Sequence, residues 1–279
     1  MSTAAATTEA PAVTAVATST SGQLRWHKEG HVGHITFDNQ KKFNAVNLDM
    51  WLALPKAIDE FNADPDVRVV LLQGAGEKAF VSGADISQFD HQRSGDGAAI
   101  YNNATEAGYL SILACTKPVV AKIRGVCMGG GLGIVVNCDV RICADDAKFR
   151  MPAGRLGLGY GFSGLKRFNE VMGPANTADL FFSARIFGGA DALTLGLVKQ
   201  VVAVADFDKT VADYVQMICE NAPLTLKAAK GALIEMRKPQ VEQDPGRVGK
   251  LVEACFASDD YKEGRKAFAE KRVPDFKGR

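Results

Sequence analysis

Short apolar runs separated by helical segments constrain the fold of this chain more than any other feature. Residues 24–38 (LRWHKEGHVGHITFD) predict two strands around a turn at Glu29 and Gly30, and residues 67–74 (VRVVLLQG) predict a buried strand that ends in glycine. Further strands are predicted for KPVVAKIRG (117–125), DVRICAD (139–145) and VKQVVAV (198–204). Strands that alternate with helices indicate an α/β fold.

The predicted helices lie between these strands and after the last of them. Apolar residues keep a helical period from Leu48 to Phe61, although Pro55 is expected to distort this helix or to confine it to a helix start. Residues 99–115 also have a helical pattern. Residues 79–89 (AFVSGADISQF) predict a loop and a short helix, for which Asp85 is a plausible cap.

Beyond Val204 the pattern is helical only. Residues 1–22 are rich in Ala, Thr and Ser and contain neither Lys nor Arg, which is typical of a disordered tail and not of a secretory or transit segment. We therefore expect a disordered tail over residues 1–22, a core over residues 23–204 and a helical C-terminal region over residues 205–279.

Composition excludes several classes of partner. The chain has 279 residues, of which 47% are hydrophobic, enough for one large domain with or without an appendage. Its net charge of +1 provides no overall field for nucleic acid or anionic membrane, and no apolar stretch approaches the roughly 20 residues of a membrane span. The six cysteines lie mostly inside apolar runs without CxxC pairs, as reduced core thiols do, which predicts a cytoplasmic protein.

Two glycine-rich segments compete as sites for an anion. Residues 159–164 (GYGFSG) match GxGxxG, but no clean strand precedes them, and the chain has no GxxxxGK[ST] motif, so a dinucleotide or P-loop site is not expected. The triplet Gly129-Gly130-Gly131 follows a predicted strand and opens an apolar helix. The first amides of a helix lack intrahelical partners and lie at its positive end, so they can hold a phosphate or an oxyanion. The alternative is that these glycines only permit a tight turn.

Several motifs in order resemble the enoyl-CoA hydratase/isomerase (crotonase) superfamily, from Leu24 to Arg279. They are NQKKFNAV (39–46), VRVVLLQGAGEKAFVSGADI (67–86), KPVVAKIRGVCMGGGLGIVVNCDV (117–140), FRMP (149–152) and YKEGRKAFAEKR (261–272). The resemblance implies a ββα spiral core, a helical C-terminal trimerisation region and a trimer or a dimer of trimers. It also implies an acyl-CoA substrate, with no cofactor beyond its CoA moiety.

The resemblance also assigns residues to this site. The thioester carbonyl of an acyl-CoA would accept hydrogen bonds from the backbone amides of Ala84 and Gly130, an oxyanion hole that stabilises an enolate more than the substrate. For CoA, the matching positions are Ser82, Ala84 and Ile86 at the adenine, Lys41 near the phosphates, and Phe268 and Lys271 reaching the ligand of a neighbouring subunit. For the two lysines, plain solvated charge is the alternative.

Both glutamates of the hydratase pattern are absent from this chain. Their positions hold Gly133 and Ala153, and the position of an aspartate used by some relatives holds Gly161. Hydration requires a base that activates water and an acid that protonates carbon, and neither glycine nor alanine supplies these functions. Classical two-glutamate hydration is therefore not expected.

Tyr160 is the candidate side chain that remains, with Arg155, Ser163 and Glu106 as lesser candidates. The chain shows some resemblance to the methylmalonyl-CoA decarboxylase branch, which has a tyrosine at the position of Tyr160 and lacks both glutamates, but has a histidine where this chain has Ala84. Decarboxylation forms the enolate by loss of CO2 and requires no strong base. The alternative for Tyr160 is a packing role, and Glu106 better fits a solvated helix face.

Three functions therefore stay open. The first is enolate chemistry on an acyl-CoA, as a decarboxylase-like lyase or an isomerase. The second is a catalytically silent CoA-binding or RNA-associated scaffold, and the third is a hydratase with an unidentified acid and base. The four histidines, His27, His31, His34 and His91, show no ligand spacing for a metal, so no metal site is predicted.

Overall fold

The computed structural model describes residues 22–85 and 96–279 and contains a large, mostly parallel sheet. Its six strands follow the order β1-β2-β3-β5-β7-β10, and only the hairpin β1-β2 is antiparallel. The strands are β1 (Gln23–Glu29), β2 (Val32–Asp38), β3 (Val69–Gly74), β5 (Val119–Ile123), β7 (Val140–Ala144) and β10 (Gln200–Val202). Every strand predicted from the sequence is present in this sheet, which confirms the α/β class.

A second sheet of four very short strands was not predicted. It has the order β4-β6-β8-β9, with β4 (Ala79–Val81), β6 (Val126–Met128), β8 (Lys148–Arg150) and β9 (Phe187–Gly188). Runs of two or three residues are too short to show the alternation that identifies a strand. The chain passes from the large sheet to this sheet at Gly125, whose φ of 63° favours glycine and where a Cβ would overlap the carbonyl oxygen of Lys78.

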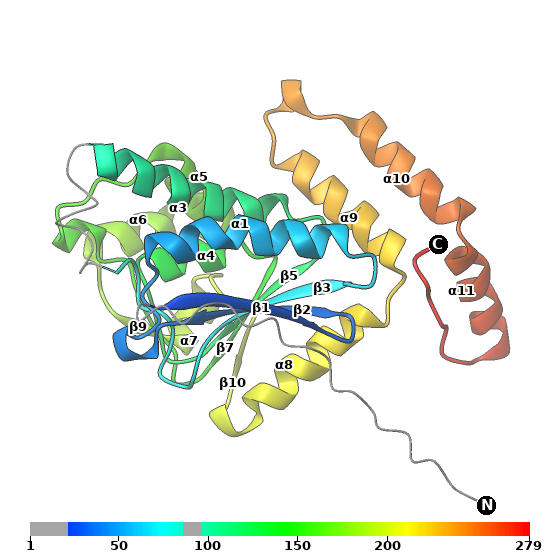
Figure 1. Cartoon of the computed structure of the whole chain (residues 1–279), viewed down its shortest axis with the longest axis horizontal. Helices are drawn as coiled ribbons and strands as arrows, with labels where there is room; N and C mark the ends of the chain where they lie inside the picture. Colours follow the sequence, from blue (N-terminus) through cyan, green and yellow to red (C-terminus); the bar gives the residue numbers. More distant parts are fainter. Residues whose placement is uncertain (1–21, 86–95) are drawn as a thin grey trace, which may run out of the picture.

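Helices cover both faces of the large sheet (Figure 1). Those on one side include α1 (Leu48–Ala63), α3 (Asp96–Ala114), α4 (Gly130–Asn137) and α5 (Phe162–Met172), and α8 (Val204–Cys219) lies on the other side. The connections between these elements contain the short helices α6 (Pro174–Ser183) and α7 (Gly189–Thr194) and the 3-10 turns η1 (Gln40–Lys42) and η3 (Ala153–Arg155), and a further 3-10 turn, η4 (Gln240–Glu242), lies in the C-terminal region. Because each sheet face is apolar, burial against these helices accounts for most of the core.

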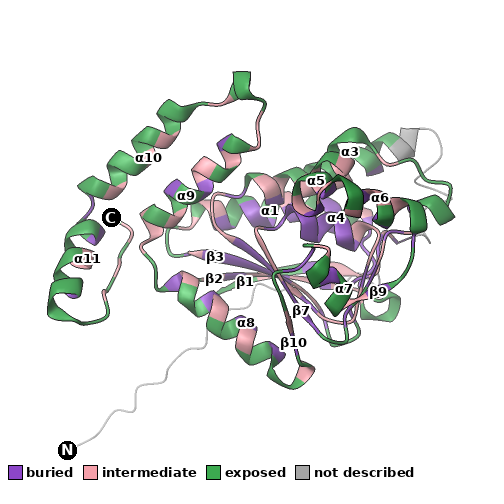
Figure 2. Ribbon diagram, turned by 180° about the vertical axis from the view of Figure 1, so that it is seen from behind, coloured by how far each residue is buried: buried purple, intermediate pink, exposed green. Residues whose placement is uncertain are grey.

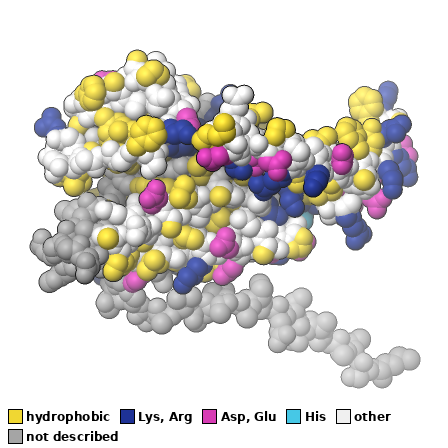
Figure 3. All heavy atoms as spheres, turned by 90° about the horizontal axis from the view of Figure 1, so that it is seen from above, with side chains coloured by type: hydrophobic (Ala, Val, Ile, Leu, Met, Phe, Trp, Pro, Cys, Tyr) yellow, Lys and Arg dark blue, Asp and Glu magenta, His cyan; other side chains and the backbone are white. Residues whose placement is uncertain are grey.

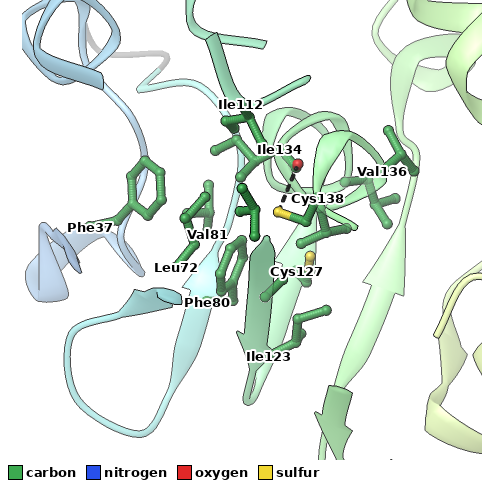
Figure 4. Packing of buried hydrophobic residues seen from close by; sticks show 14 of the residues in the cluster. Phe37, Leu72, Phe80, Val81, Ile112, Ile123, Cys127, Ile134, Val136 and Cys138 are labelled. Carbon is green, nitrogen blue, oxygen red and sulfur yellow. Dashed lines mark hydrogen bonds between the residues drawn. The ribbon is translucent and has the colours of Figure 1, made fainter. Parts of the chain in front are cut away.

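The main hydrophobic core lies between the two sheets and the helices above them. Figure 4 shows Phe80 and Val81 of β4 beside Leu72 of β3, with Ile134 of α4 closing the same cluster. A smaller core lies between α8 and the opposite face of the large sheet, and it includes Phe207, Val211 and Val215. The helix that follows the glycine triplet is thus buried on nearly all sides, which fixes its N-terminus in the interior.

Helix α1 is not confined to a start at Pro55, which was one of the two expectations for this proline. The helix runs over 16 residues with Pro55 in its interior, and it neither stops nor starts at the proline. A proline inside a helix costs about 3 kcal/mol. Trp51, Leu54 and Ile58 are fully buried on the same helix, and burying such side chains contributes about 1.5–3 kcal/mol each, so packing outweighs the local preference.

The C-terminal region is helical, as predicted. After α8 the chain forms α9 (Pro223–Met236), α10 (Pro245–Ala257) and α11 (Asp259–Glu270), which extend away from the layered core in Figures 1 and 2. Lys230 of α9 joins this region to the core, because its ammonium group lies 2.6 Å from the carboxylate of Asp139. Helix α10 buries none of its residues within the chain.

The surface has no uniform character on the face drawn in Figure 3. Lysine and arginine side chains lie among aspartates and glutamates there, and hydrophobic side chains are scattered between them. Within the two described ranges, no helix combines the length and apolar composition that crossing a membrane requires. All six cysteines are free thiols, and five of them are buried, as expected for core residues.

Candidate active site

The first backbone amide of α4 has no partner within the helix. Gly129 precedes the helix with a φ of 51°, a conformation that favours glycine, and its own N–H donates to the carbonyl of Arg150 at 3.0 Å. Gly130 is the first helical residue, so its N–H has no partner within the helix. A strand that ends immediately before the helix holds both residues in place.

The loop after β4 brings a second amide to the same place. Val46 forms a parallel bridge to this loop, because its N–H donates to the carbonyl of Gly83 at 2.8 Å and its carbonyl accepts from Asp85 at 2.9 Å. The amide of Ala84, between them, therefore points to the other side, toward Gly130. A Cβ placed on Gly130 would lie 3.6 Å from the nitrogen of Ala84, and one on Gly83 would lie 3.8 Å from the nitrogen of Gly130.

These two amides converge on one small space. Neither Ala84 nor Gly130 donates a backbone hydrogen bond to any acceptor in the described parts of the chain, 22–85 and 96–279. Both residues are half-buried, and backbone N–H groups shielded from water are nearly always paired, so two neighbouring donors without a protein acceptor suit an acceptor supplied by a ligand. The structure therefore brings together the two residues that the sequence had assigned to an oxyanion hole.

Asp85, whose side chain is buried, forms an ion pair with Lys42. Its side chain is only 5% exposed, and its carboxylate lies 2.7 Å from the ammonium group of Lys42. This ion pair links η1 to the loop that carries Ala84. The short helix predicted to follow Asp85 lies at residues 86–89, outside the described residues, as does Ile86.

Trp51 of α1 forms a wall beside the two amides. Its ring atom Cζ2 would lie 3.6 Å from a Cβ on Gly130, and its indole N–H donates to the hydroxyl of Tyr101 at 3.0 Å. The ring of Tyr109 packs edge-on against the Trp51 ring, with centroids 5.1 Å apart and an interplanar angle of 78°. A group bound by the amides would therefore enter an aromatic and largely apolar space.

Tyr160 takes part in both packing and hydrogen bonding. Its half-buried ring meets the rings of Phe168 and Phe181 edge-on, with centroid distances of 6.1 Å and 5.0 Å. Burial raises the pKa of Tyr160 to about 12, an effect that a hydrogen bond with Tyr109 reduces. The Tyr109 hydroxyl lies 3.3 Å from the carbonyl oxygen of Gly130, so Tyr160 is connected to the start of α4 through Tyr109.

Tyr109 was missed by the sequence analysis. It lies in the predicted helix 99–115, but its importance depends on Gly133, which faces it from α4. A Cβ on Gly133 would overlap the Tyr109 hydroxyl and lie 2.5 Å from its Cζ. A single sequence contains no signal that pairs a glycine in one helix with a tyrosine in another. The position of the absent glutamate is thus filled by a tyrosine.

Positions 153 and 161, which also lack a carboxylate, differ from position 133 in their surroundings. Ala153 is buried at the start of η3, whereas Gly161 is exposed and has no atom within 4 Å of its Cβ position. The lesser candidates Arg155, Ser163 and Glu106 are all exposed. The solvated-face interpretation of Glu106 is therefore confirmed.

The candidate CoA residues lie in two separate parts of the chain. Ser82 lies one residue from the Gly83-Ala84 loop, and its hydroxyl donates to the carbonyl of Lys42 at 3.0 Å, while Lys41 is exposed on η1. Phe268, 87% exposed, and Lys271 end helix α11, which Figure 1 places away from the strands and helices around Gly130. Within one chain, the structure does not bring this pair to the two amides.

Three side chains of the first hairpin form a group that the sequence analysis did not anticipate. His27 and His34 are direct cross-strand neighbours, and their rings stack with centroids 5.0 Å apart. Glu29 lies next to them, with its carboxylate 3.8 Å from Nε2 of His34. His31, in contrast, contacts the backbone carbonyl of Asp66, and His91 lies outside the described residues. The register of the hairpin pairs His27 with His34, which their spacing along the chain did not indicate.

Comparison with known proteins gives a consistent result along nearly the whole chain. The family model described as enoyl-CoA hydratase/isomerase matches residues 27–279. A short-chain-enoyl-CoA hydratase of Clostridium acetobutylicum is 33% identical over 255 residues, which cover 90% of this chain and 97% of that protein. A peroxisomal Delta(3,5)-Delta(2,4)-dienoyl-CoA isomerase of Arabidopsis thaliana is 32% identical over 265 residues, or 91% and 95% of the two chains.

Solved structures agree with this result. A protein of Magnetospirillum magneticum described as an enoyl-CoA hydratase/carnithine racemase has a TM-score of 0.85 at 32% identity, over 92% of this chain and 96% of that one. An enoyl-CoA hydratase of Bacillus anthracis has a TM-score of 0.82 at 26% identity, over 92% and 99%. The chain belongs to the enoyl-CoA hydratase/isomerase family, and its fold is the crotonase fold.

Proposed function

We propose that this protein binds an acyl-CoA thioester and stabilises its enolate between the amides of Ala84 and Gly130. The observation that supports this proposal is the convergence of two free backbone donors beside Trp51. Donors fixed in advance where negative charge develops lower the barrier of such reactions, typically by about 3–4 kcal/mol for each donor. The relatives named as a hydratase, an isomerase and a carnitinyl-CoA dehydratase carry CoA in their names, which supports the same substrate class.

The reaction we propose is a decarboxylase-like C–C cleavage. In that step, the electron pair of the bond to the leaving carboxylate becomes the enolate, CO2 departs, and the α-carbon then takes a proton. No base is required, which fits a site with Gly133, Ala153 and Gly161 at the carboxylate positions. Tyr160, protonated at neutral pH, is a donor and a poor base, so it would orient the substrate carboxylate or assist protonation.

One screen distinguishes this proposal from the two alternatives, a catalytically silent scaffold and a hydratase with another acid and base. A set of acyl-CoA thioesters, including malonyl-type and enoyl-type compounds, would be incubated with the protein and followed by mass spectrometry. Loss of CO2 from a malonyl-type thioester supports the proposal. Binding of every compound without turnover would favour a silent scaffold, and hydration of an enoyl thioester would favour a hydratase with another acid and base.

Substitution of Tyr160 by phenylalanine is expected to lower turnover of the cleaved thioester by about 10²-fold, because the variant lacks the hydroxyl that donates a proton or a hydrogen bond. The ring contacts to Phe168 and Phe181 remain, so the melting temperature and the affinity for CoA should stay nearly level. Steady-state kinetics and calorimetry measure both quantities. Unchanged turnover, or a collapse of stability together with turnover, would make Tyr160 a packing residue.

Charge reversal at Lys41 or Lys271 is expected to weaken CoA binding in a salt-dependent way, because both lysines are proposed to meet CoA phosphates. An exposed ion pair contributes up to about 1 kcal/mol, or roughly fivefold in affinity at low salt. Lys56→Glu provides the control, since Lys56 is an exposed lysine on α1 and has no proposed role. Equal affinity of all three variants in calorimetry would reassign Lys41 and Lys271 to solvent.

Self-association as a trimer or a dimer of trimers completes the proposal. Helix α10 buries no residue within the chain, and Val252, Phe256 and Phe268 expose apolar surface on α10 and α11. A neighbouring copy over these helices would bury that surface and would allow Phe268 and Lys271 to reach its ligand. We propose a cytoplasmic location, supported by the free thiols, and no cofactor beyond the CoA moiety of the substrate.

A further inference from the structure

We propose that Tyr109 is a catalytic residue that protonates the α-carbon of the enolate. Its hydroxyl lies where a glutamate side chain at position 133 would begin. This inference rests on the proposed function and adds the proton donor to it. Nothing in the motifs that identify the family points to Tyr109. It follows from the contacts of Tyr109 with Gly133, Gly130 and Trp51.

The first argument for this role is the position of the Tyr109 hydroxyl. A side chain at position 133 would start where the Tyr109 hydroxyl lies, because a Cβ on Gly133 would overlap that oxygen. The hydroxyl is also 3.3 Å from the carbonyl of Gly130, the residue whose N–H faces Ala84. Gly130 and Gly133 lie on the same turn of α4, so the hydroxyl is within one helical turn of the proposed enolate.

The surroundings of Tyr109 hold its ring in this position. Trp51 packs against the ring of Tyr109 and also lies next to the Cβ position of Gly130, so one indole contacts both parts of the site. The hydrogen bond with Tyr160 fixes the hydroxyl from the other side. A ring supported on one edge and hydrogen-bonded at its tip has little freedom, which is what directed proton transfer requires.

The proton transfer balances with water as the final source of the proton. Cleavage leaves an electron pair in the enolate, and the α-carbon uses it to form a C–H bond with the proton of the Tyr109 hydroxyl. The phenolate of Tyr109 takes the proton of Tyr160, and Tyr160 regains one from water. Because Tyr109 approaches from α3 alone, the α-carbon receives its proton on one face.

Deuterium labelling separates this role from a structural one. Wild type and Tyr109→Phe would cleave a 2-methyl-malonyl thioester in D2O, and the configuration of the deuterated α-carbon would be measured. The wild type is expected to give one configuration, and the variant a mixture, with turnover lower by about 10²-fold. The control is Tyr101→Phe on the same helix, which removes a buried hydroxyl bonded to Trp51 and Val46 and should keep the configuration.

The outcomes distinguish the inference from the function on which it rests. Wild-type turnover with an unchanged configuration and rate in Tyr109→Phe would overturn the role of Tyr109 and leave the enolate function in place. Absence of turnover by the wild type with every thioester would remove the proposed function itself. A mixed configuration in the wild type would also overturn the inference, because the proton would then come from water.

A different observation carries a second inference. The geometry points to a zinc site on the outer face of the β1-β2 hairpin, formed by His27, Glu29 and His34. One ligand atom from each residue lies within 4.8 Å of the other two. Tetrahedral zinc with bonds of about 2.0–2.2 Å needs donors about 3.3 Å apart, so small side-chain rotations complete the set.

The exposure of Glu29 allows these rotations. Glu29 is 79% exposed and follows His27 on the same face of β1, since residues two apart share a face. The neighbouring Lys122 is already neutralised by Asp208 at 2.7 Å. Two imidazoles and a carboxylate with one open position suit zinc better than the hard ions calcium and magnesium.

Titration of the full chain with ZnCl2, under a thiol reductant, tests this site by calorimetry. We expect one zinc ion per chain in the wild type and at least a tenfold loss of affinity in His34→Ala. His31→Ala, on the same hairpin but bonded to the Asp66 carbonyl, is the matched control and should bind as the wild type does. Equal zinc binding by His34→Ala, or none by the wild type, would overturn the inference.

Discussion

Turnover is expected to fall by about 10²–10³-fold when Gly130 is replaced by alanine, because one methyl group would occupy the space between the two free amides. The Cβ would lie 3.6 Å from both the nitrogen of Ala84 and Cζ2 of Trp51, which is ordinary van der Waals contact. The variant should therefore fold normally while a thioester oxygen can no longer reach the amides. Backbone donors cannot be removed by substitution, so filling the space is the available test.

Two measurements and a control define the result. Single-turnover kinetics on the cleaved thioester should show the loss, and thermal unfolding should show a melting temperature close to that of the wild type. Gly188→Ala on β9 introduces the same methyl group where the nearest atoms, Nζ of Lys148 and the carbonyl oxygen of Ala147, lie 3.9 and 4.0 Å away, and it should leave both quantities unchanged. If Gly130→Ala retains full turnover, the enolate oxygen is held elsewhere and the site has been misplaced.

The strands and helices with a clear period were predictable from the sequence, and the smaller sheet was not. The run KPVVAKIRG contains a short apolar stretch, and β5 forms where this stretch predicts it, with four of its five residues buried. Strand β9 has only two residues, and its existence depends on its pairing with β8. Local sequence cannot encode such pairing, because it is decided by which distant segment lies alongside.

Some residues of the candidate site could be predicted from the sequence and others could not. Gly130 and Ala84 lie in motifs, and their amides converge because backbone geometry follows from the glycine triplet and from the bridge to Val46. Tyr109 and the pair Lys42-Asp85 depend on side chains that meet across helices or loops, and nothing in the local sequence marks them. The Pro55 error has a related cause, since burial of Trp51 and its neighbours is a property of the folded core.

The wild-type protein is expected to hydrate crotonyl-CoA very slowly, because the functions missing at Gly133 and Ala153 each contribute roughly 10²–10⁴-fold to such reactions. Loss of the conjugated enoyl absorbance measures this rate. Hydration by the wild type at the rate of an ordinary hydratase would contradict the prediction and would require an acid and a base elsewhere in the site.

Introducing glutamates at positions 133 and 153 tests whether Tyr109 occupies the space of the missing side chain. Gly133→Glu with Ala153→Glu is expected to remain inactive and to lose about 1–3 kcal/mol of stability, since the new side chain at 133 overlaps the Tyr109 ring. Adding Tyr109→Ala removes that ring and provides space for the glutamate, so the triple variant should be more stable than the double variant and should gain hydration. The comparison of the two variants is decisive because they share both carboxylates and differ only at residue 109. Equal stability and equal hydration in both would mean that Tyr109 does not occupy the space of the missing glutamate.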